Sequence, residues 1–192
     1  MVRADGGAAM TPEASLTLKV VDALNACQVP YLLAGSFASN FYGIPRSTKD
    51  ADFVLQHAGG VGGDFAAKLD AEFVLEPQLS FETVTGTYRQ YLRHAGTSFK
   101  IELFQLSADE HDQVRFARRL EQLLFNRKVW ILSPEDVIVS KLRWARSKDE
   151  GDVRDVLLVQ SGKLDMPYIE SWCQRHGTID ALRRMQSVIN KL

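Results

Sequence analysis

The stretch LLAGSFASNFYGIPRSTKDADFVL, residues 32–55, decides the fold of this chain. An apolar, strand-like run stops at Gly35-Ser36, and a second run begins with Asp50 and Asp52, one residue apart. On an extended chain these two carboxylates face the same way, which is unfavourable unless a positive group lies between them. The pattern therefore predicts a strand, a short helix from Ser36 to Tyr42 and a second strand with two acidic side chains on one face.

The composition is that of an ordinary globular protein. The 192 residues are 45% hydrophobic and 24% charged, with a net charge of −1, and the length suits one domain or a core with a small appendage. The near-neutral charge argues against a protein that coats nucleic acid through bulk electrostatics. The two cysteines and four histidines form no redox or zinc motif. No stretch is long enough to cross a membrane and the N-terminus has no apolar signal segment, so we expect a cytoplasmic protein without membrane partners.

Periodicity and capping signals predict an α+β fold, a small mixed β-sheet flanked by helices, followed by a C-terminal helical subdomain. The expected strands are 30–35, 50–55, 87–94, 98–105 and 128–132. The expected helices are 12–27, 36–42, 64–71, 112–125, 134–147, 152–160, 167–175 and 179–190. We divide the chain into a loose tail (1–12), an α/β core (13–132) and the helical subdomain (133–192).

The residues around Asp50 and Asp52 favour a functional role for this pair. A lone Asp-x-Asp is weak evidence, because 14 aspartates in this chain give roughly one such pair by chance, and a solvent-facing strand end would explain it. Gly35-Ser36, however, lies at a strand-to-helix corner that suits a phosphate. Glu102 points away from the apolar face of its own strand, so three carboxylates converge if the two strands are neighbours. Such a cluster suits Mg²⁺ or Mn²⁺.

In this order the motifs resemble the signature of the polymerase-β-type nucleotidyltransferase superfamily. That signature is a hydrophobic strand, Gly-Ser, a spacer, and then acid-hydrophobic-acid-hydrophobic, which Asp50-Ala51-Asp52-Phe53 matches. FKIELF, residues 99–104, is similar to the third acidic strand of that superfamily. Residues 132–159, LSPEDVIVSKLRWARSKDEGDVRDVLLV, resemble the helical motif of minimal nucleotidyltransferases of the AbiEii abortive-infection toxin type, where a lysine and an aspartate motif follow the core.

The resemblance implies a metal-dependent nucleotidyltransferase of the nucleotidyltransferase fold. It would move a nucleoside monophosphate from a nucleoside triphosphate, such as ATP, to an acceptor hydroxyl on RNA, protein or a small molecule. The implied metal ligands are Asp50, Asp52 and Glu102, and the catalytic set adds Lys141 and Asp152. The candidate phosphate-binding residues are Gly35, Ser36, Arg46, Lys49 and Lys141. The AbiEii resemblance also implies a toxin with a cognate antitoxin.

The position of Lys141 on its predicted helix is unusual even without the family resemblance. On a helical projection of residues 137–147 it falls in the middle of the apolar arc, where an unpaired ammonium is costly. It therefore snorkels to water, pairs with a buried carboxylate, or holds a phosphate, and we favour the phosphate. Asp152 shares a helical face with Val156 and Val159. It either caps a helix after Gly151, pairs with Lys141, or takes part in catalysis, and the pattern does not separate its role from that of Asp155.

Other interpretations stay open at this point. Arg115, Arg118 and Arg119 form a basic face with Gln122 on the expected helix 112–125, which is either an ordinary amphipathic surface or an RNA contact. A catalytically weak relative that binds only nucleotide or a partner protein is the main alternative. A two-metal nuclease fits less well, because the order Lys100-Ile101-Glu102 is the reverse of the expected Glu-x-Lys. A glycosyltransferase would need a longer chain.

Overall fold

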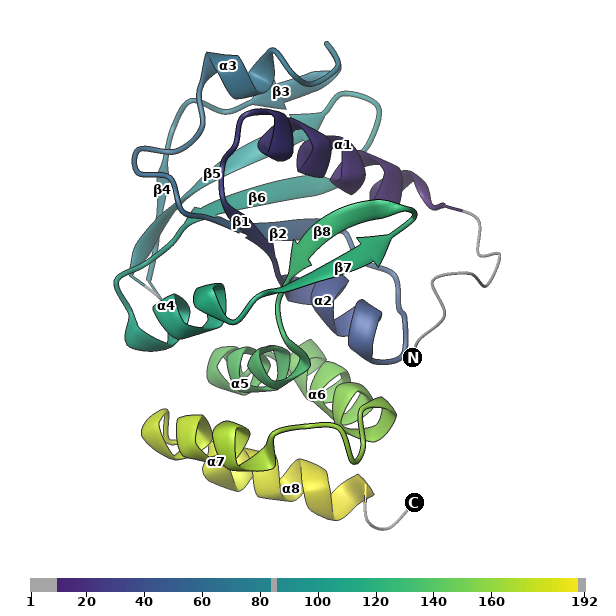
Figure 1. Cartoon of the computed structure of the whole chain (residues 1–192), viewed down its shortest axis with the longest axis vertical. Helices are drawn as coiled ribbons and strands as arrows, with labels where there is room; N and C mark the ends of the chain where they lie inside the picture. Colours follow the sequence, from purple (N-terminus) through teal and green to yellow (C-terminus); the bar gives the residue numbers. More distant parts are fainter. Residues whose placement is uncertain (1–9, 84–85, 190–192) are drawn as a thin grey trace.

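The computed structural model describes residues 10–83 and 86–189 (Figure 1). Its helices are α1 (Pro12–Ala26), α2 (Gly35–Tyr42), α3 (Gly63–Ala66), α4 (Glu110–Ala117), α5 (Pro134–Trp144), α6 (Ser147–Val159), α7 (Met166–Arg175) and α8 (Ile179–Ile189). Its strands are β1 (Tyr31–Leu33), β2 (Asp50–Leu55), β3 (Phe73–Leu75), β4 (Ser80–Glu82), β5 (Thr87–His94), β6 (Lys100–Gln105), β7 (Leu120–Leu124) and β8 (Arg127–Ile131).

The strands form one mixed sheet in the order β3-β5-β6-β2-β1-β8-β7, with β4 also paired to β5. The central strand β2 runs parallel to β6 and antiparallel to β1. Figure 1 shows α1 lying across the sheet, while α5 to α8 gather beyond one end of the strands. The predicted α+β class, a mixed sheet flanked by helices, is confirmed.

Two helix starts follow their sequence signals closely. The Thr11 hydroxyl accepts a hydrogen bond from the Ala14 N–H at 3.2 Å, with proline next in the chain, at the start of α1. Ser133 does the same for the Asp136 N–H at 3.2 Å, and Pro134 begins α5. Both caps satisfy N–H groups that the first turn of a helix leaves unpaired. The expected tail 1–12 therefore ends at the α1 cap, and its residues 1–9 lie outside the described part of the chain.

The prediction of one helix over 112–125 is wrong. Helix α4 ends at Ala117, and the chain then forms the hairpin β7–β8, whose two-residue turn has positive φ at Phe125 (48°) and Asn126 (62°). Such a turn suits the twist of paired strands, and cross-strand pairing outweighs the helical spacing of the leucines. The proposed basic face is lost, because Arg115 is buried in α4 while Arg119 and Gln122 lie beyond its end.

Smaller departures concern two missed strands and the ends of several elements. The expected helix 64–71 is a single turn, α3, and strands β3 and β4 were not predicted. Helix α5 stops at Trp144 because Ala145 adopts the left-handed conformation, at φ 51°. Helix α6 then starts at Ser147 instead of Asp152, so the interpretation of Asp152 as a helix cap is wrong. The last expected helix is described to Ile189, and residue 190 lies outside the described part.

Candidate active site

The corner between β1 and α2 brings a glycine against a carboxylate. Gly35 has φ +57°, and a Cβ atom added there would lie 1.8 Å from Oδ2 of Asp52. The Ala34 N–H also donates to the Asp52 carbonyl at 2.8 Å. Only glycine fits both this backbone conformation and this close approach, so the Gly-Ser pair and the acidic strand form one local unit.

Three carboxylates meet beside this corner. Asp50 and Asp52 share one face of β2, and Glu102 on β6 lies directly opposite Asp52 in the parallel register. Burial, followed by the negative charges of Asp50 and Glu102, raises the pKa of Asp52 to about 7. Within residues 10–83 and 86–189 no hydrogen bond reaches the Asp52 carboxylate, while Asp50 accepts one from Thr48 at 3.0 Å. Burial and the two neighbouring carboxylates thus outweigh the positive charges of Lys141 and Arg146 that also act on Asp52.

Glu102 already has a partner, the guanidinium of Arg89 on β5. Arg89 Nη1 lies 2.9 Å from Glu102 Oε2, and the guanidinium also lies over the ring of Tyr91 at 5.0 Å from its centroid. In the described part of the chain no three His, Cys, Asp or Glu side chains are grouped closely enough to hold a metal ion. Arg89 contacts one carboxylate oxygen of Glu102, Oε2, and so competes with a metal for this side chain.

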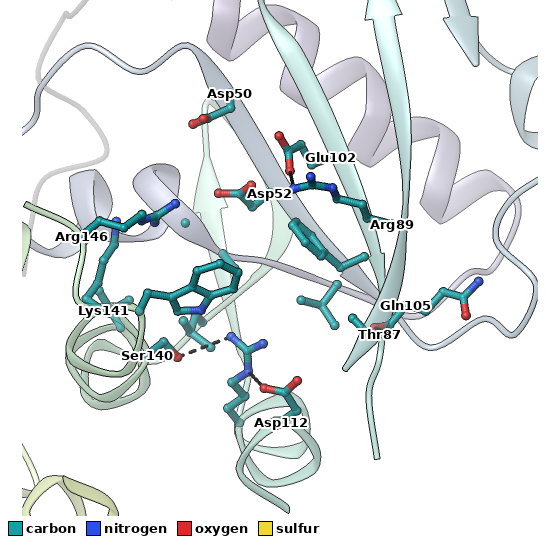
Figure 2. Close-up of a pocket in the computed structure, with 18 residues that line it drawn as sticks. Asp50, Asp52, Thr87, Arg89, Glu102, Gln105, Asp112, Ser140, Lys141 and Arg146 are labelled. Atoms are coloured by element: carbon teal, nitrogen blue, oxygen red, sulfur yellow. Dashed lines mark hydrogen bonds and ion pairs between the residues drawn. The ribbon is translucent and has the colours of Figure 1, made fainter. Parts of the chain in front are cut away.

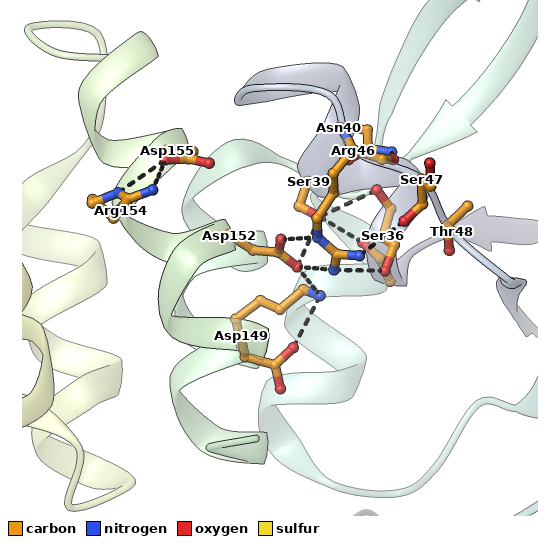
Figure 3. A network of polar contacts seen from close by, with 12 residues as sticks. Ser36, Ser39, Asn40, Arg46, Ser47, Thr48, Asp149, Asp152, Arg154 and Asp155 are labelled. Carbon is orange, nitrogen blue, oxygen red and sulfur yellow. Dashed lines mark hydrogen bonds and ion pairs between the residues drawn. The ribbon is translucent and has the colours of Figure 1, made fainter. Parts of the chain in front are cut away.

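Lys141 lies in a buried network of charges with Asp149 and Asp152, both of which Figure 3 labels. Its ammonium donates to Asp152 Oδ2 at 2.6 Å and to Asp149 Oδ1 at 3.1 Å, and all three side chains are at most 5% exposed. Arg46 holds Asp152 with two further bonds, at 2.6 and 2.8 Å. Burial alone would raise the pKa of Asp152, but hydrogen bonds from Arg46 and Lys141 outweigh it and hold that pKa at about 2.

Two of the residues that the sequence suggested for phosphate binding, Ser36 and Arg46, belong to the same network. The Ser36 hydroxyl is buried and accepts a hydrogen bond from Arg46 at 3.2 Å. Asp155 faces away and pairs with the neighbouring Arg154 at 2.9 Å (Figure 3). Asp152 is therefore the aspartate that faces the core of the molecule, and it does pair with Lys141.

A pocket of about 160 Å³ connects the carboxylates to the first turn of α2 and to α5 (Figure 2). Of the predicted site residues, those that line it are Gly35, Asp50, Asp52, Glu102 and Lys141. Those outside its lining are Ser36, Arg46, Lys49 and Asp152. The pocket therefore brings together the predicted metal ligands and one of the predicted cations.

Sequence reasoning missed several residues of this pocket. Arg146, which follows α5, lines it and is bound to Asp149 through Nε at 2.8 Å. Its charge acts on Asp52 and Asp50 together with that of Lys141. Arg89, Arg115 and Trp144 also line the pocket. A usable signal for Arg146 was its spacing of three from Asp149, which lets both side chains share one helix start.

A mixed sheet with carboxylates on two adjacent parallel strands, a Gly-Ser corner and a lysine from a following helix is the arrangement of a nucleotidyltransferase. The chain belongs to a family described as "Nucleotidyltransferase of unknown function (DUF6036)", whose model matches residues 25–187. No curated protein matches the sequence at a significant level.

Solved structures share the fold at low sequence identity. The antibiotic-resistance factor ANT(2'')-Ia in solution is 14% identical, with a TM-score of 0.53 over 92% of this chain and 94% of that one. Its complex with adenylyl-2''-tobramycin is 15% identical, with a TM-score of 0.54 over 86% of this chain and 97% of that one. A candidate nucleotidyltransferase from H. pylori is 17% identical, with a TM-score of 0.51 over 94% of this chain and 82% of that one. At these identities the likeness concerns the fold alone.

In the described residues no helix is long and apolar enough to cross a membrane.

Proposed function

We propose that the protein transfers a nucleoside monophosphate from a nucleoside triphosphate to an acceptor hydroxyl, with a divalent cation held at Asp50 and Asp52. The observation that carries this proposal is the Asp52 carboxylate, which lies against Gly35 beside two other carboxylates and has no hydrogen-bond donor among the described residues. A buried acidic cluster of this kind is stable in its charged form only with added positive charge.

The chemistry of the carboxylates suits a divalent metal, either Mg²⁺ or Mn²⁺, although the three side chains would have to draw closer together to hold it. Carboxylate oxygens are the ligands that both cations prefer, and burial, together with the charges of Asp50 and Glu102, raises the pKa of Asp52 and so opposes its ionisation. Glu102 would join the two aspartates in competition with its contact to Arg89. Such a cation, when bound, neutralises charge on the phosphates and lowers the pKa of an acceptor hydroxyl.

The chain's own groups orient the reaction. Gly35 lets the first turn of α2 lie directly against Asp52, and a phosphate would bind at the N–H groups of that turn, because the cap residue Ala34 provides no side-chain hydrogen bond. Lys141 and Arg146 add fixed positive charge on the opposite wall of the pocket. The acceptor hydroxyl loses its proton to solvent as its oxygen attacks the α-phosphorus, the bond from that phosphorus to the β-phosphate oxygen breaks, and pyrophosphate leaves. Arg46 and Asp152 act as positioning residues, since they hold Lys141 and the α2 corner in place.

The direct test is label transfer. Protein, Mg²⁺ and each labelled nucleoside triphosphate are incubated with RNA, protein and small-molecule acceptors, and the wild type is compared with Asp52→Ala and with Asp155→Asn as the matched control. We expect transfer by the wild type and by the control, and loss of at least a hundredfold in Asp52→Ala. Transfer that persists in Asp52→Ala contradicts the proposal. Metal-dependent nucleotide binding without transfer to any acceptor supports the alternative of a binding protein.

The toxin activity that the AbiEii resemblance implies has its own test. Expression of the wild type should arrest growth, and Asp50→Ala should relieve the arrest. A protein encoded by a neighbouring gene that restores growth without the substitution would be the cognate antitoxin. Normal growth with wild-type protein at a high level contradicts the toxin role and leaves nucleotidyl transfer to be judged by the label assay.

A further inference from the structure

A buried arginine lies in the pocket away from the carboxylates. Arg115 on α4 is 8% exposed and lines the same pocket as Asp52. Among the described residues its two polar contacts are Asp112 and Ser140, which Figure 2 shows on the side of the pocket away from Asp50 and Glu102. Neither the three carboxylates nor the Lys141 network touches it, so the proposed chemistry does not account for a buried cation at this place.

The contacts of Arg115 leave hydrogen-bond donors unused. A guanidinium has five N–H donors and no acceptor. Nε lies 2.8 Å from Asp112 Oδ1 but without hydrogen-bond geometry, and Nη1 donates weakly to Ser140 at 3.4 Å. In the part of the chain that the structure describes, Nη2 has no hydrogen-bond partner. Asp112 offers little to a ligand, because it is 3% exposed and its second oxygen already accepts from Ser107 at 2.5 Å. A ligand here must therefore bring acceptors.

The walls beside Arg115 suit a flat ring. Trp144 and Phe104, both half-buried, line the pocket together with apolar side chains of Val54, Leu132 and Val137. Aromatic walls of this kind favour planar groups through stacking and dispersion. The pocket is thus lined by the acidic cluster, by Lys141 and Arg146, which would bind phosphates, by aromatic walls and by the guanidinium of Arg115.

We propose that this part of the pocket is the nucleobase subsite of the nucleoside triphosphate, and that Arg115 selects bases with two adjacent hydrogen-bond acceptors. Guanine presents O6 and N7 side by side, the pair that a guanidinium binds with two bonds, and cytosine presents O2 and N3. Adenine has its amino donor beside N1 and N7 and offers no two adjacent acceptors, and uracil places its N3–H between its two oxygens. The inference rests on the proposed nucleotidyl transfer and changes the expected nucleotide from ATP to GTP or CTP.

The first experiment measures affinity without requiring turnover. Calorimetric titration of wild-type protein with each of the four nucleoside triphosphates in Mg²⁺ should show GTP or CTP binding about tenfold or more tighter than ATP and UTP, since a good bidentate contact discriminates by this order. Equal affinity for all four overturns the base subsite and leaves the proposed transfer intact. Absence of binding by any nucleotide overturns both.

Two variants assign the preference to Arg115. Arg115→Lys keeps a positive charge beside Asp112 but lacks the planar fork, so the preference should fall to within about twofold while ATP affinity stays unchanged. Arg118→Lys is the matched control, because it lies at the end of the same helix outside the pocket lining and should leave all four affinities unchanged. An equal loss for all four nucleotides in Arg115→Lys overturns the proposal. Thermal melting of both variants checks that they fold.

Competition by nucleosides, which carry no phosphate, tests whether the subsite beside Arg115 binds a base or an anion. Guanosine or cytidine carries no phosphate, so either one should compete with its own triphosphate more strongly than adenosine does, and the difference should disappear in Arg115→Lys. If free phosphate or a carboxylate compound competes through Arg115 and the nucleosides do not, the subsite binds an anion and the base assignment is wrong.

Discussion

The pocket joins two clusters of buried charge that are built in opposite ways. Lys141, Arg46 and Arg146 surround Asp149 and Asp152, and each carboxylate there has at least two charged donors. Asp52, by contrast, has two carboxylate neighbours and no hydrogen-bond donor in the described residues. The first cluster is complete as folded and so stabilises the protein, whereas the second is electrostatically unfavourable until a ligand arrives. Substitutions should therefore change stability in opposite directions in the two clusters.

The largest effect should come from Lys141→Ala. The substitution leaves Asp149 and Asp152, both at most 6% exposed, with one cation fewer in a buried site. Breaking a buried ion pair from one side costs about 3–5 kcal/mol of the free energy of unfolding. Urea denaturation measures it, and Lys49→Ala, an exposed lysine of the nearby loop, is the control with a change of about 0.5 kcal/mol or less. A loss under 1 kcal/mol in Lys141→Ala would show that the network is not a stabilising unit.

Gly35→Ala should cost somewhat less, about 2–4 kcal/mol, through strain at a positive φ and overlap of the new methyl group with Asp52. Gly151→Ala is the matched control. Gly151 lies within α6, an added Cβ there meets nothing within 4 Å, and alanine should stabilise the helix by about 0.5–1 kcal/mol. The two glycine variants should thus have opposite signs in the same denaturation assay. Destabilisation of similar size in both would contradict the close approach of Gly35 to Asp52.

Asp52→Asn should stabilise the metal-free protein by about 1–3 kcal/mol at pH 8, because it removes a buried charge that lacks a partner. Asp152→Asn, the same chemical change in the complete cluster, should destabilise by about 2–4 kcal/mol. Added Mg²⁺ should raise the melting temperature of the wild type and not that of Asp52→Asn. If both substitutions destabilise the protein equally, the contrast between the two clusters is wrong.

Sequence patterns predicted the parts of the site that are local in the chain. Gly35, Asp50 and Asp52 lie within one strand–helix–strand unit, and the α5 cap follows from Ser133-Pro134, so spacing alone indicated their arrangement. Lys141 was visible because a charge in the middle of an apolar helical face needs a reason.

The missed features depend on contacts between distant segments. The pairing of Glu102 with Arg89 needs the β5–β6 register, and the base subsite needs α4 to approach α5. The β7–β8 hairpin was missed because Phe125-Asn126 is not a typical turn pair and the leucines before it fit a helical spacing. Arg146 was missed because the expected helix 134–147 placed it inside one helix, whereas the left-handed Ala145 ends α5 and Arg146 caps α6 beside the pocket.

The smallest effect, and the most specific, is a pH dependence of stability. The folded pKa of Asp52 is raised to about 7, so between about pH 4 and 7 the folded protein binds a proton that the unfolded chain does not. Asp52 alone therefore makes the free energy of unfolding fall as pH rises through this window, by at most about 1.4 kcal/mol per pH unit.

His176 acts the other way, because burial lowers its pKa to about 4 and its contribution to stability rises with pH up to about 6.5. The contributions of Asp52 and His176 are separated by measuring the free energy of unfolding by urea denaturation in metal-free buffer from pH 5 to 8. The curve of Asp52→Asn is then subtracted from that of the wild type. The difference should favour the wild type progressively toward pH 5. A flat difference would mean that Asp52 is ionised without cost, and the acidic cluster would then need no cation.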